Sequence, residues 1–287
     1  MKRFEMAFPE SVSEACQILA DNPGSRPIAG GTALSIVMKE GIYAPERLVN
    51  IRGLKSELDY VTLDDDVVRI GALTPMVDIE RAEPIVEHLP TISQCLGNIA
   101  GVRVRNTATI GGHLAHADLH LDLPPVLAGL DAEVCLSTGS DERRLPVDEF
   151  IRGYYDTALE PAELITEITI PVPEENTRGV YLKHRYFSEV DWPCVGVAAF
   201  AVEADGAFSD VRVLLNSVGK SSIMAVEGID DVIDSSLSDE AIEAVAELAR
   251  EQSSPSSDIR GSAAYKERMA GEFTGRALRA IRDEEAN

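Results

Sequence analysis

The sequence of 287 residues contains no apolar run long enough for a membrane-spanning helix, which needs about 20 consecutive apolar residues. Its first ten residues, MKRFEMAFPE, carry a basic pair but lack the apolar segment of a secretory signal. We therefore expect a cytoplasmic protein without a transmembrane segment.

Cysteine is scarce and scattered. The chain has four cysteines, Cys16, Cys95, Cys135 and Cys194, and no two of them form a C-x-x-C pair. Iron–sulfur clusters and zinc ribbons need closely spaced thiolates, so neither is expected in this chain. We expect all four thiols to be ordinary packing residues.

Positive charge is also in short supply. The chain has 26 Lys and Arg residues against 49 Asp and Glu, which gives a net charge of −23. Such a surface repels nucleic acids and anionic membranes, so neither is an expected partner. Both a high-salt cytoplasm and a basic partner subunit would explain the excess of acid. A phosphate ligand would have to be held mostly by backbone N–H groups.

The segments that are present predict an α+β protein of two domains. The pattern places a first domain at residues 1–174, with subdomains at about 1–55 and 56–174, and a smaller domain at 175–287. The stretch PVPEENTRG, Pro171 to Gly179, is the candidate linker. Beyond it we expect a β-hairpin that turns at Asp205-Gly206, followed by two amphipathic helices.

A first glycine turn lies in IAGGTALSIV, where a strand-like segment is followed by Gly30-Gly31-Thr32 and a helical pattern. Glycine allows positive φ and lets backbone N–H groups come close to a ligand. The beginning of a helix also attracts anions. A plain turn with Thr32 as helix N-cap is the alternative interpretation of this stretch.

A second glycine turn follows about eighty residues later, in NTATIGG, which we interpret as a short strand that enters the turn at Gly111-Gly112. Two such loops suit a ligand with two phosphates, such as a dinucleotide. The sequence has no G-x-G-x-x-G motif, so a Rossmann site is not indicated.

Three of the five histidines, His113, His116 and His120, follow this second turn in TIGGHLAHADLHLDLPP. On a continuous helix they would share one face, and their spacing lies within the range of metal ligands. Metal-binding imidazoles also need a rigid element and hydrogen-bonded partners, whereas this segment runs from a double glycine to Pro124-Pro125. A polar network of histidines is therefore preferred to a metal site.

Three stretches taken together carry a family resemblance: IAGGTALSIVMKEG, RNTATIGGHLAHADLHLDLPPVLAGLDAEV and GVYLKHRYFSEVDWPCVGVAA. In this order they resemble the FAD-binding medium subunit of the molybdenum hydroxylases, a group that includes aerobic carbon monoxide dehydrogenase and the flavin domain of xanthine dehydrogenase. The segment SPSSDIRGSAAYKERMAGEFTGRAL is similar to the end of that subunit. The resemblance covers nearly the whole chain.

The resemblance implies a two-subdomain FAD-binding domain of the p-cresol methylhydroxylase and vanillyl-alcohol oxidase type, followed by a smaller α+β domain. It implies non-covalent FAD and two backbone loops around the diphosphate. Asp122 would bind at the nucleotide side, Ile165 and Trp192 would lie near the flavin ring, and Lys183 would tune the flavin at its N1/C2=O edge. The implied cofactor-binding residues are Ala29, Gly30, Gly31, Thr32, Ala33, Leu34, Ser35, Ile99, Thr109, Ile110, Gly111, Gly112, His113, Asp122, Ile165, Lys183 and Trp192.

The chain departs from the family pattern at two positions. His113 follows TIGG where the family usually has Asn, and Leu119 follows Asp118 where the family commonly has Pro. A histidine still offers one hydrogen bond, so FAD binding is expected to survive with altered geometry and a pH dependence.

The resemblance implies an oxidoreductase subunit that passes electrons from [2Fe–2S] clusters of a small partner subunit through FAD to an external acceptor. A large partner subunit would carry molybdopterin and oxidise the substrate, and the complex would be a dimer of heterotrimers. Three alternatives stay open: a stand-alone flavin oxidoreductase, a His-ligated metal-dependent hydrolase, and a scaffold that has lost FAD.

Overall fold

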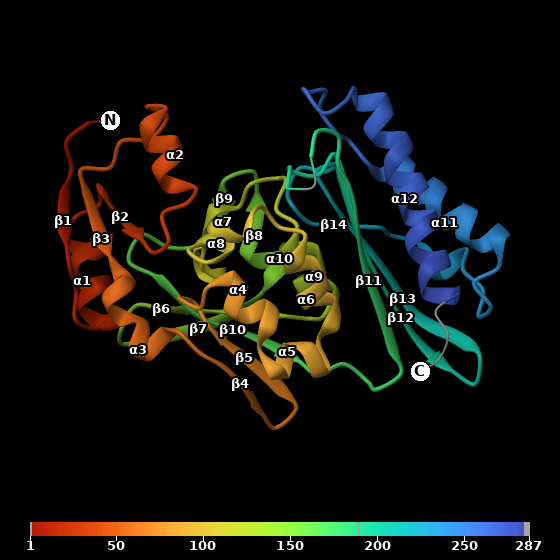
Figure 1. Ribbon diagram of the computed structural model, residues 1–287, viewed down its shortest axis with the longest axis horizontal. Coiled ribbons are helices and arrows are strands. Elements are labelled where there is room, and N and C mark those ends of the chain that lie inside the picture. The colour runs from red at the N-terminus through yellow and green to blue at the C-terminus, as the bar shows by residue number, and fades with distance from the viewer. Residues whose placement is uncertain (1, 189, 284–287) are drawn as a thin grey trace.

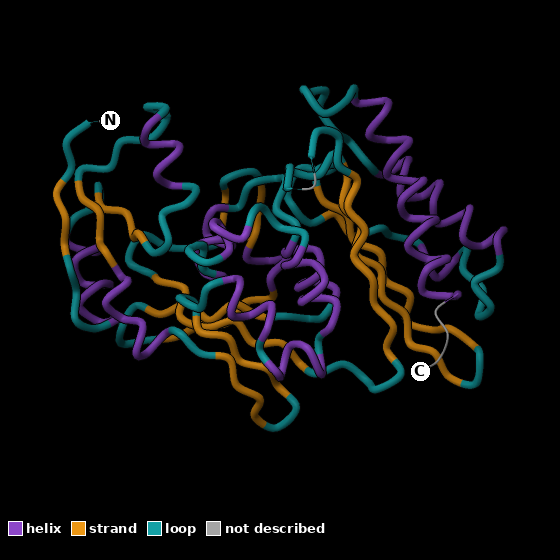
Figure 2. Tube along the Cα trace, in the orientation of Figure 1, coloured by secondary structure: helices purple, strands orange, loops and turns teal. Residues whose placement is uncertain are grey.

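The computed structural model describes residues 2–188 and 190–283, and these form three parts side by side (Figures 1 and 2). A small β/α unit at the N-terminus is followed by a central sheet with helices. A second sheet with two long helices ends the chain. The expected α+β architecture is confirmed. Within the described residues, none of the helices has the length and apolar character needed to cross a membrane.

The N-terminal unit is a three-stranded parallel sheet in the order β1-β3-β2. Its helix α1 begins at Val12, where the Ser11 hydroxyl accepts a hydrogen bond from the Glu14 N–H as an N-cap. The elements of this unit are β1 (Glu5–Ala7), α1 (Val12–Asp21), β2 (Ser25–Ile28), α2 (Leu34–Lys39), β3 (Arg47–Asn50), η1 (Ile51–Leu54) and α3 (Lys55–Leu58).

The central part is built on a five-stranded antiparallel sheet in the order β4-β5-β10-β6-β7. Asp65 and Asp66, which join β4 to β5, have φ angles of 46° and 62°, as a two-residue hairpin turn requires. The strands are β4 (Val61–Asp64), β5 (Val67–Gly71), β6 (Glu133–Ser137), β7 (Glu142–Pro146) and β10 (Leu164–Pro171).

Short helices fill the space between this sheet and the C-terminal sheet (Figure 1). Their apolar residues form one buried core with the inner face of the five-stranded sheet. The remaining central elements are α4 (Met76–Arg81), α5 (Glu83–His88), α6 (Pro90–Gly97), α7 (Val102–Arg105), α8 (Ile110–His116), α9 (Leu123–Gly129), α10 (Val147–Phe150), β8 (Ile151–Gly153) and β9 (Asp156–Thr157).

The C-terminal part is a four-stranded antiparallel sheet in the order β11-β12-β13-β14, with the predicted turn at Asp205-Gly206. Helices α11 and α12 cover its outer face, and the central helices cover its inner face (Figure 1). The elements are β11 (Thr177–His184), β12 (Val195–Ala204), β13 (Ala207–Asn216), β14 (Met224–Ala225), η2 (Ile229–Asp231), α11 (Asp239–Gln252) and α12 (Ala263–Asp283).

Close packing joins the central and C-terminal parts. Phe200 of β12 is 3% exposed and belongs to the core of the central part rather than to the core under α11 and α12. A Cβ atom on Gly129 of α9 would lie 2.3 Å from the Phe200 ring, so only glycine fits there. The stretch between the two parts is shorter than the expected linker, because β10 runs to Pro171 and β11 already begins at Thr177.

Candidate functional site

The first glycine loop joins β2 to α2 and leaves its amides available. Gly31 has a φ of 70°, which favours glycine, and α2 begins at Leu34 with Ala33 rather than Thr32 as its N-cap. In the part of the chain that the structure describes, no hydrogen bond uses the backbone N–H of Gly31, Thr32, Ala33 or Leu34. Four unused amides in one bend can hold an anionic ligand.

The two glycine segments meet in space although they are far apart in the sequence. A Cβ atom on Gly30 would lie 2.0 Å from the Thr107 carbonyl oxygen, so the two backbones touch and no side chain fits between them. Gly30, Thr107 and Thr109 also line a single pocket. The predicted convergence of the two bends is therefore present in the fold.

The second glycine segment differs from the expected strand and turn. Gly111 and Gly112 lie in the first turn of α8, where the Thr109 hydroxyl accepts a hydrogen bond from the Gly112 N–H at 3.3 Å. Three further N–H groups of this segment are already hydrogen-bonded to carbonyl oxygens: Ile110 donates to Thr74, Gly111 to Ala72 and His113 to Thr109. The Thr109 N-cap stabilises the start of a helix at a position where the sequence pattern had predicted a strand and a turn. The segment therefore contributes a backbone that lies close to the first glycine loop, but it does not contribute a second row of unused amides.

The two glycines of α8 face different surroundings. A Cβ atom on Gly111 would lie 2.8 Å from the Ala72 Cβ and 2.9 Å from the Ala72 carbonyl oxygen, inside the packing against the central sheet. Gly112 is exposed, and a Cβ there would contact only the Thr109 hydroxyl, at 3.0 Å. Gly111 is therefore required for packing, and Gly112 is the glycine that a ligand can approach.

The histidines do not share one helical face. Helix α8 ends at His116, because Ala117 takes a φ of 47°, and His120 lies beyond that break. Within the described residues, no three His, Cys, Asp or Glu side chains come close enough to hold a metal ion.

His113 is the residue of this segment with an unmet hydrogen-bonding group. Its Nε2 atom is buried and has no partner among the described residues. Burial lowers the pKa of His113 to about 3, and the neighbouring His116 adds to the effect. The imidazole is therefore neutral near pH 7, and the expected pH dependence of flavin binding stays a prediction.

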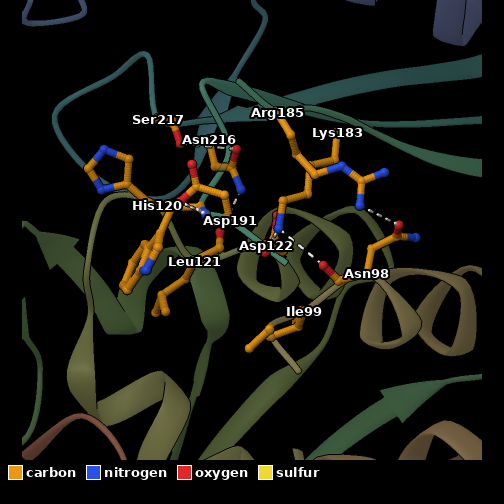
Figure 3. Close-up of polar contacts among 12 residues, drawn as sticks. Asn98, Ile99, His120, Leu121, Asp122, Lys183, Arg185, Asp191, Asn216 and Ser217 are labelled. Atoms are coloured by element: carbon orange, nitrogen blue, oxygen red, sulfur yellow. Dashed lines mark hydrogen bonds and ion pairs between the residues drawn. The ribbon is translucent and has the colours of Figure 1, made fainter. Parts of the chain in front are cut away.

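A buried ion pair joins β11 to the start of α9. Lys183 Nζ lies 2.9 Å from Asp122 Oδ2, and the two side chains are 3% and 6% exposed. Lys183 also donates to the carbonyl oxygen of Asn98 at 3.1 Å (Figure 3). Tyr181, two residues before Lys183 on the same strand face, donates from its hydroxyl to Asp122 Oδ1 at 2.5 Å. Asn216 of β13 donates to the Tyr181 hydroxyl at 3.2 Å.

This network alters the ionisation of its members. Burial raises the pKa of Asp122, and the charge of Lys183 counteracts part of that rise. Burial, followed by the nearby Asp122 carboxylate, raises the pKa of Tyr181 well above its usual value. Asp122 was expected at the nucleotide side and Lys183 at the flavin; the structure joins their side chains in one ion pair, and the two roles stay predictions.

Of the other expected site residues, Ile99 lies beside this network (Figure 3): it follows Asn98 and is 8% exposed. Ile165 of β10 is buried in the core of the central part. Trp192 lies in the segment after β11 and is 38% exposed. Its ring packs edge-on against His120 with centroids 5.5 Å apart. The His120 Nδ1 atom in turn lies 2.9 Å from an Asp118 carboxylate oxygen.

Sequence reasoning missed Tyr181, Asn98 and Asn216, although Tyr181 could have been found from its i−2 spacing to Lys183 on a strand. The arrangement as a whole offers unused amides, an exposed glycine backbone, an unsatisfied imidazole nitrogen and a buried ion pair. These features fit an elongated ligand with an anionic bridge and a polar ring system. Fold and site together define a flavoprotein that binds FAD outside the Rossmann class.

Comparisons with known proteins also indicate an FAD-binding protein. Residues 2–173 match the FAD binding domain in molybdopterin dehydrogenase, and residues 182–281 match the CO dehydrogenase flavoprotein C-terminal domain. The chain therefore belongs to the family of FAD-binding subunits of molybdopterin dehydrogenases, as the resemblance of its motifs implied, and it is an oxidoreductase flavoprotein.

Similar proteins align with nearly the whole chain. The carbon monoxide dehydrogenase medium chain of Hydrogenophaga pseudoflava is 32% identical over 97% of this chain and 96% of its own length. The glyceraldehyde dehydrogenase medium chain of Sulfolobus acidocaldarius is 30% identical over 97% and 98%. The solved carbon monoxide dehydrogenase of Hydrogenophaga pseudoflava superposes with a TM-score of 0.93 at 32% identity over 98% of this chain and 97% of the other.

The two helical glycines yield a matched pair of variants. Gly112→Val is expected to reduce FAD affinity at least tenfold while the free energy of unfolding stays within about 1 kcal/mol of the wild type, because the position is exposed and the added side chain meets only the Thr109 hydroxyl. Gly111→Val is expected to cost about 1–3 kcal/mol of stability, since its side chain meets the Ala72 backbone. FAD titration and urea unfolding measure the two effects. Equal stability losses in both variants would contradict the assignment.

The ion pair predicts a stability defect. Lys183→Met leaves the Asp122 carboxylate buried without a cation and is expected to lower the free energy of unfolding by about 3–5 kcal/mol. An acid whose folded pKa is raised destabilises the fold as pH rises through that pKa, so the loss should be larger at pH 8 than at pH 5. Urea unfolding at both pH values measures this. The Lys183→Met/Asp122→Asn double variant should recover part of the loss, and a pH-independent defect would argue against the pair.

His113 predicts a pH effect on stability. His113 takes up a proton below about pH 6.5 in the unfolded chain, but only near pH 3 in the folded chain. As pH decreases between these two values, the free energy of unfolding therefore falls by up to about 1.4 kcal/mol per pH unit. In the FAD-free chain, His113→Asn should flatten the dependence of unfolding free energy on pH between 6 and 4 (about two pH units of the titration). Identical slopes for variant and wild type would show that His113 is protonated in the fold.

Proposed function

We propose that this chain is the electron-transferring FAD subunit of a molybdenum-containing hydroxylase. The observation that carries the proposal is the direct contact between the two glycine segments, Gly30 against Thr107, beside a loop of unused amides. That juxtaposition provides a place for the diphosphate of a dinucleotide in a protein whose net charge of −23 would otherwise repel it.

Each group of residues has a distinct part in the proposal. The amides of the loop that follows β2 hold the diphosphate, and the exposed backbone at Gly112 allows the cofactor to lie close to α8. The joined side chains of Asp122 and Lys183 lie together at the flavin end, where Trp192 flanks the ring. Because the Asp122 carboxylate neutralises the ammonium, the pair orients the flavin more than it adds positive charge. FAD, when bound, supplies the ability to take up and release electrons.

The proposal includes partners, because the relatives named medium chains imply larger and smaller companion chains. A large subunit would carry molybdopterin and oxidise the substrate, and a small subunit would carry the [2Fe–2S] clusters. We propose a cytoplasmic dimer of heterotrimers, with the boundary between the two domains of this chain at residues 174–175.

A stand-alone flavin oxidoreductase is less well supported. Such an enzyme needs a substrate pocket over the flavin, usually covered by a substantial additional domain. Here the C-terminal part consists of one sheet and two long helices, and its inner face is packed against the central part through Phe200 and the Asp122–Lys183 network. This leaves a role in electron transfer between partners as the better fit.

The decisive experiment compares the chain alone with the chain expressed beside its chromosomal neighbours. The single chain should bind FAD reversibly, keep it after EDTA dialysis and fail to oxidise any hydroxylation substrate. The purified complex should contain molybdenum, iron and FAD in fixed ratio, with a native mass that corresponds to two copies of each subunit. Substrate turnover by the single chain at a normal enzymatic rate would refute the electron-transfer role.

A further inference from the structure

The edge of the N-terminal sheet brings a second chain segment to the glycine loop. Strands β2 and β3 are parallel and end side by side, with Ile28 opposite Asn50. Ligands of α/β sheets bind beyond the carboxyl ends of parallel strands. The glycine loop follows β2, and η1 and α3, with Arg52 and Lys55, follow β3. Both connections therefore open onto the same edge.

A pocket of about 30 Å³ lies where these connections meet the second glycine segment. Arg52 and Lys55 line it together with Gly30, Asn106, Thr107 and Thr109. The space is sufficient for a small polar group but not for a ring system. It places two cationic side chains beside the loop whose amides are unused.

The Arg52 guanidinium is available for a ligand. Arg52 is exposed, and its guanidinium forms no hydrogen bond or ion pair with the described residues, while its backbone N–H donates to the Asn50 side chain. Lys55 forms a surface ion pair with Asp59 at 3.2 Å, and the two side chains are 50% and 25% exposed. Such i,i+4 pairs contribute only about 0.3–0.5 kcal/mol, so Lys55 can turn to a stronger anion at little cost.

Local cations matter more here than the net charge suggests. At physiological salt the Debye length is about 8 Å, so most of the distant carboxylates are screened at the pocket. A guanidinium presents a planar fork of N–H donors that matches phosphate oxygens, and its hydrogen bonds to an anion are stronger than those of a neutral amide. Arginine beside the loop would offset the unfavourable charge of an acidic protein.

We propose that Arg52, with Lys55 beside it, forms a side-chain phosphate subsite that holds the diphosphate of the dinucleotide against the amides of the loop after β2. This inference rests on the proposed FAD function and adds two side-chain cations beside the loop of backbone amides. From the scarcity of positive charge, backbone N–H groups were expected to do most of the phosphate binding. The subsite is formed by the tertiary contact of β3 with β2.

The subsite can be removed without disturbing the fold, because both side chains are exposed and neither belongs to a buried core. In the full-length chain prepared without FAD, Arg52→Gln is expected to weaken FAD binding about tenfold at low salt. A loss of this size is typical when one hydrogen bond to a charged group is removed. The Arg52→Gln/Lys55→Gln double variant should bind still more weakly. Its affinity should also depend less on salt concentration than that of the wild type.

Controls separate the subsite from general charge effects. The Arg268→Gln/Arg279→Gln variant also removes two positive charges, but from α12, which lies at the other end of the molecule (Figure 1). Its FAD affinity should stay within about twofold of the wild type because distant charges are screened. Arg52→Lys should restore part of the affinity, since it keeps the charge but loses the planar fork.

Competition with ADP identifies the contacted group, since ADP retains the diphosphate and lacks the flavin. The dissociation constant of ADP should rise about tenfold in Arg52→Gln, as that of FAD does. Unchanged FAD affinity and salt dependence in the double variant, or an unchanged ADP dissociation constant in Arg52→Gln, would overturn the subsite. A wild-type chain that binds no FAD would instead refute the proposed function itself.

Discussion

The site depends on one backbone-to-backbone contact. Gly30 lies so close to the Thr107 carbonyl that a Cβ would approach it to 2.0 Å, and this contact joins the N-terminal β/α unit to the segment before α8. Any side chain at that position would force the two loops apart. Because interiors are close-packed and deform little, such a displacement would open the bend whose amides remain unused. The proposed dinucleotide site therefore depends on the contact between the N-terminal β/α unit and the central part.

A second constraint sets the position of the C-terminal part. The buried Asp122–Lys183 pair, with Tyr181 and Asn216, connects the start of α9 to strands β11 and β13. A buried charge is tolerated only when its partner and hydrogen bonds are in place, so this network specifies a single docking geometry. The same docking brings Trp192 and His120 into contact. One set of interactions therefore joins the central and C-terminal parts beside the proposed site.

The acidity of the chain makes local arrangement decisive. A net charge of −23 disfavours a dianionic bridge at long range, but screening limits that effect to roughly a Debye length, about 8 Å. Arg52 and Lys55 line the pocket beside Gly30, and in the proposed subsite their charges oppose the negative charge of the chain there. An acidic protein can hold a dinucleotide in this way while its outer surface stays strongly negative.

The sequence by itself determined much of this protein. Its hydrophobic patterns specified the α+β class, the hairpin at Asp205-Gly206 and the last two helices, because these features depend on neighbours in the chain. Its glycine motifs also revealed the family. Only the tertiary structure decided that the second glycine segment is helical, since Thr109 caps α8 and Gly111 packs on Ala72. The tertiary fold likewise made Asp122 and Lys183 partners and brought Arg52 to Gly30, because these contacts join segments that no local pattern relates.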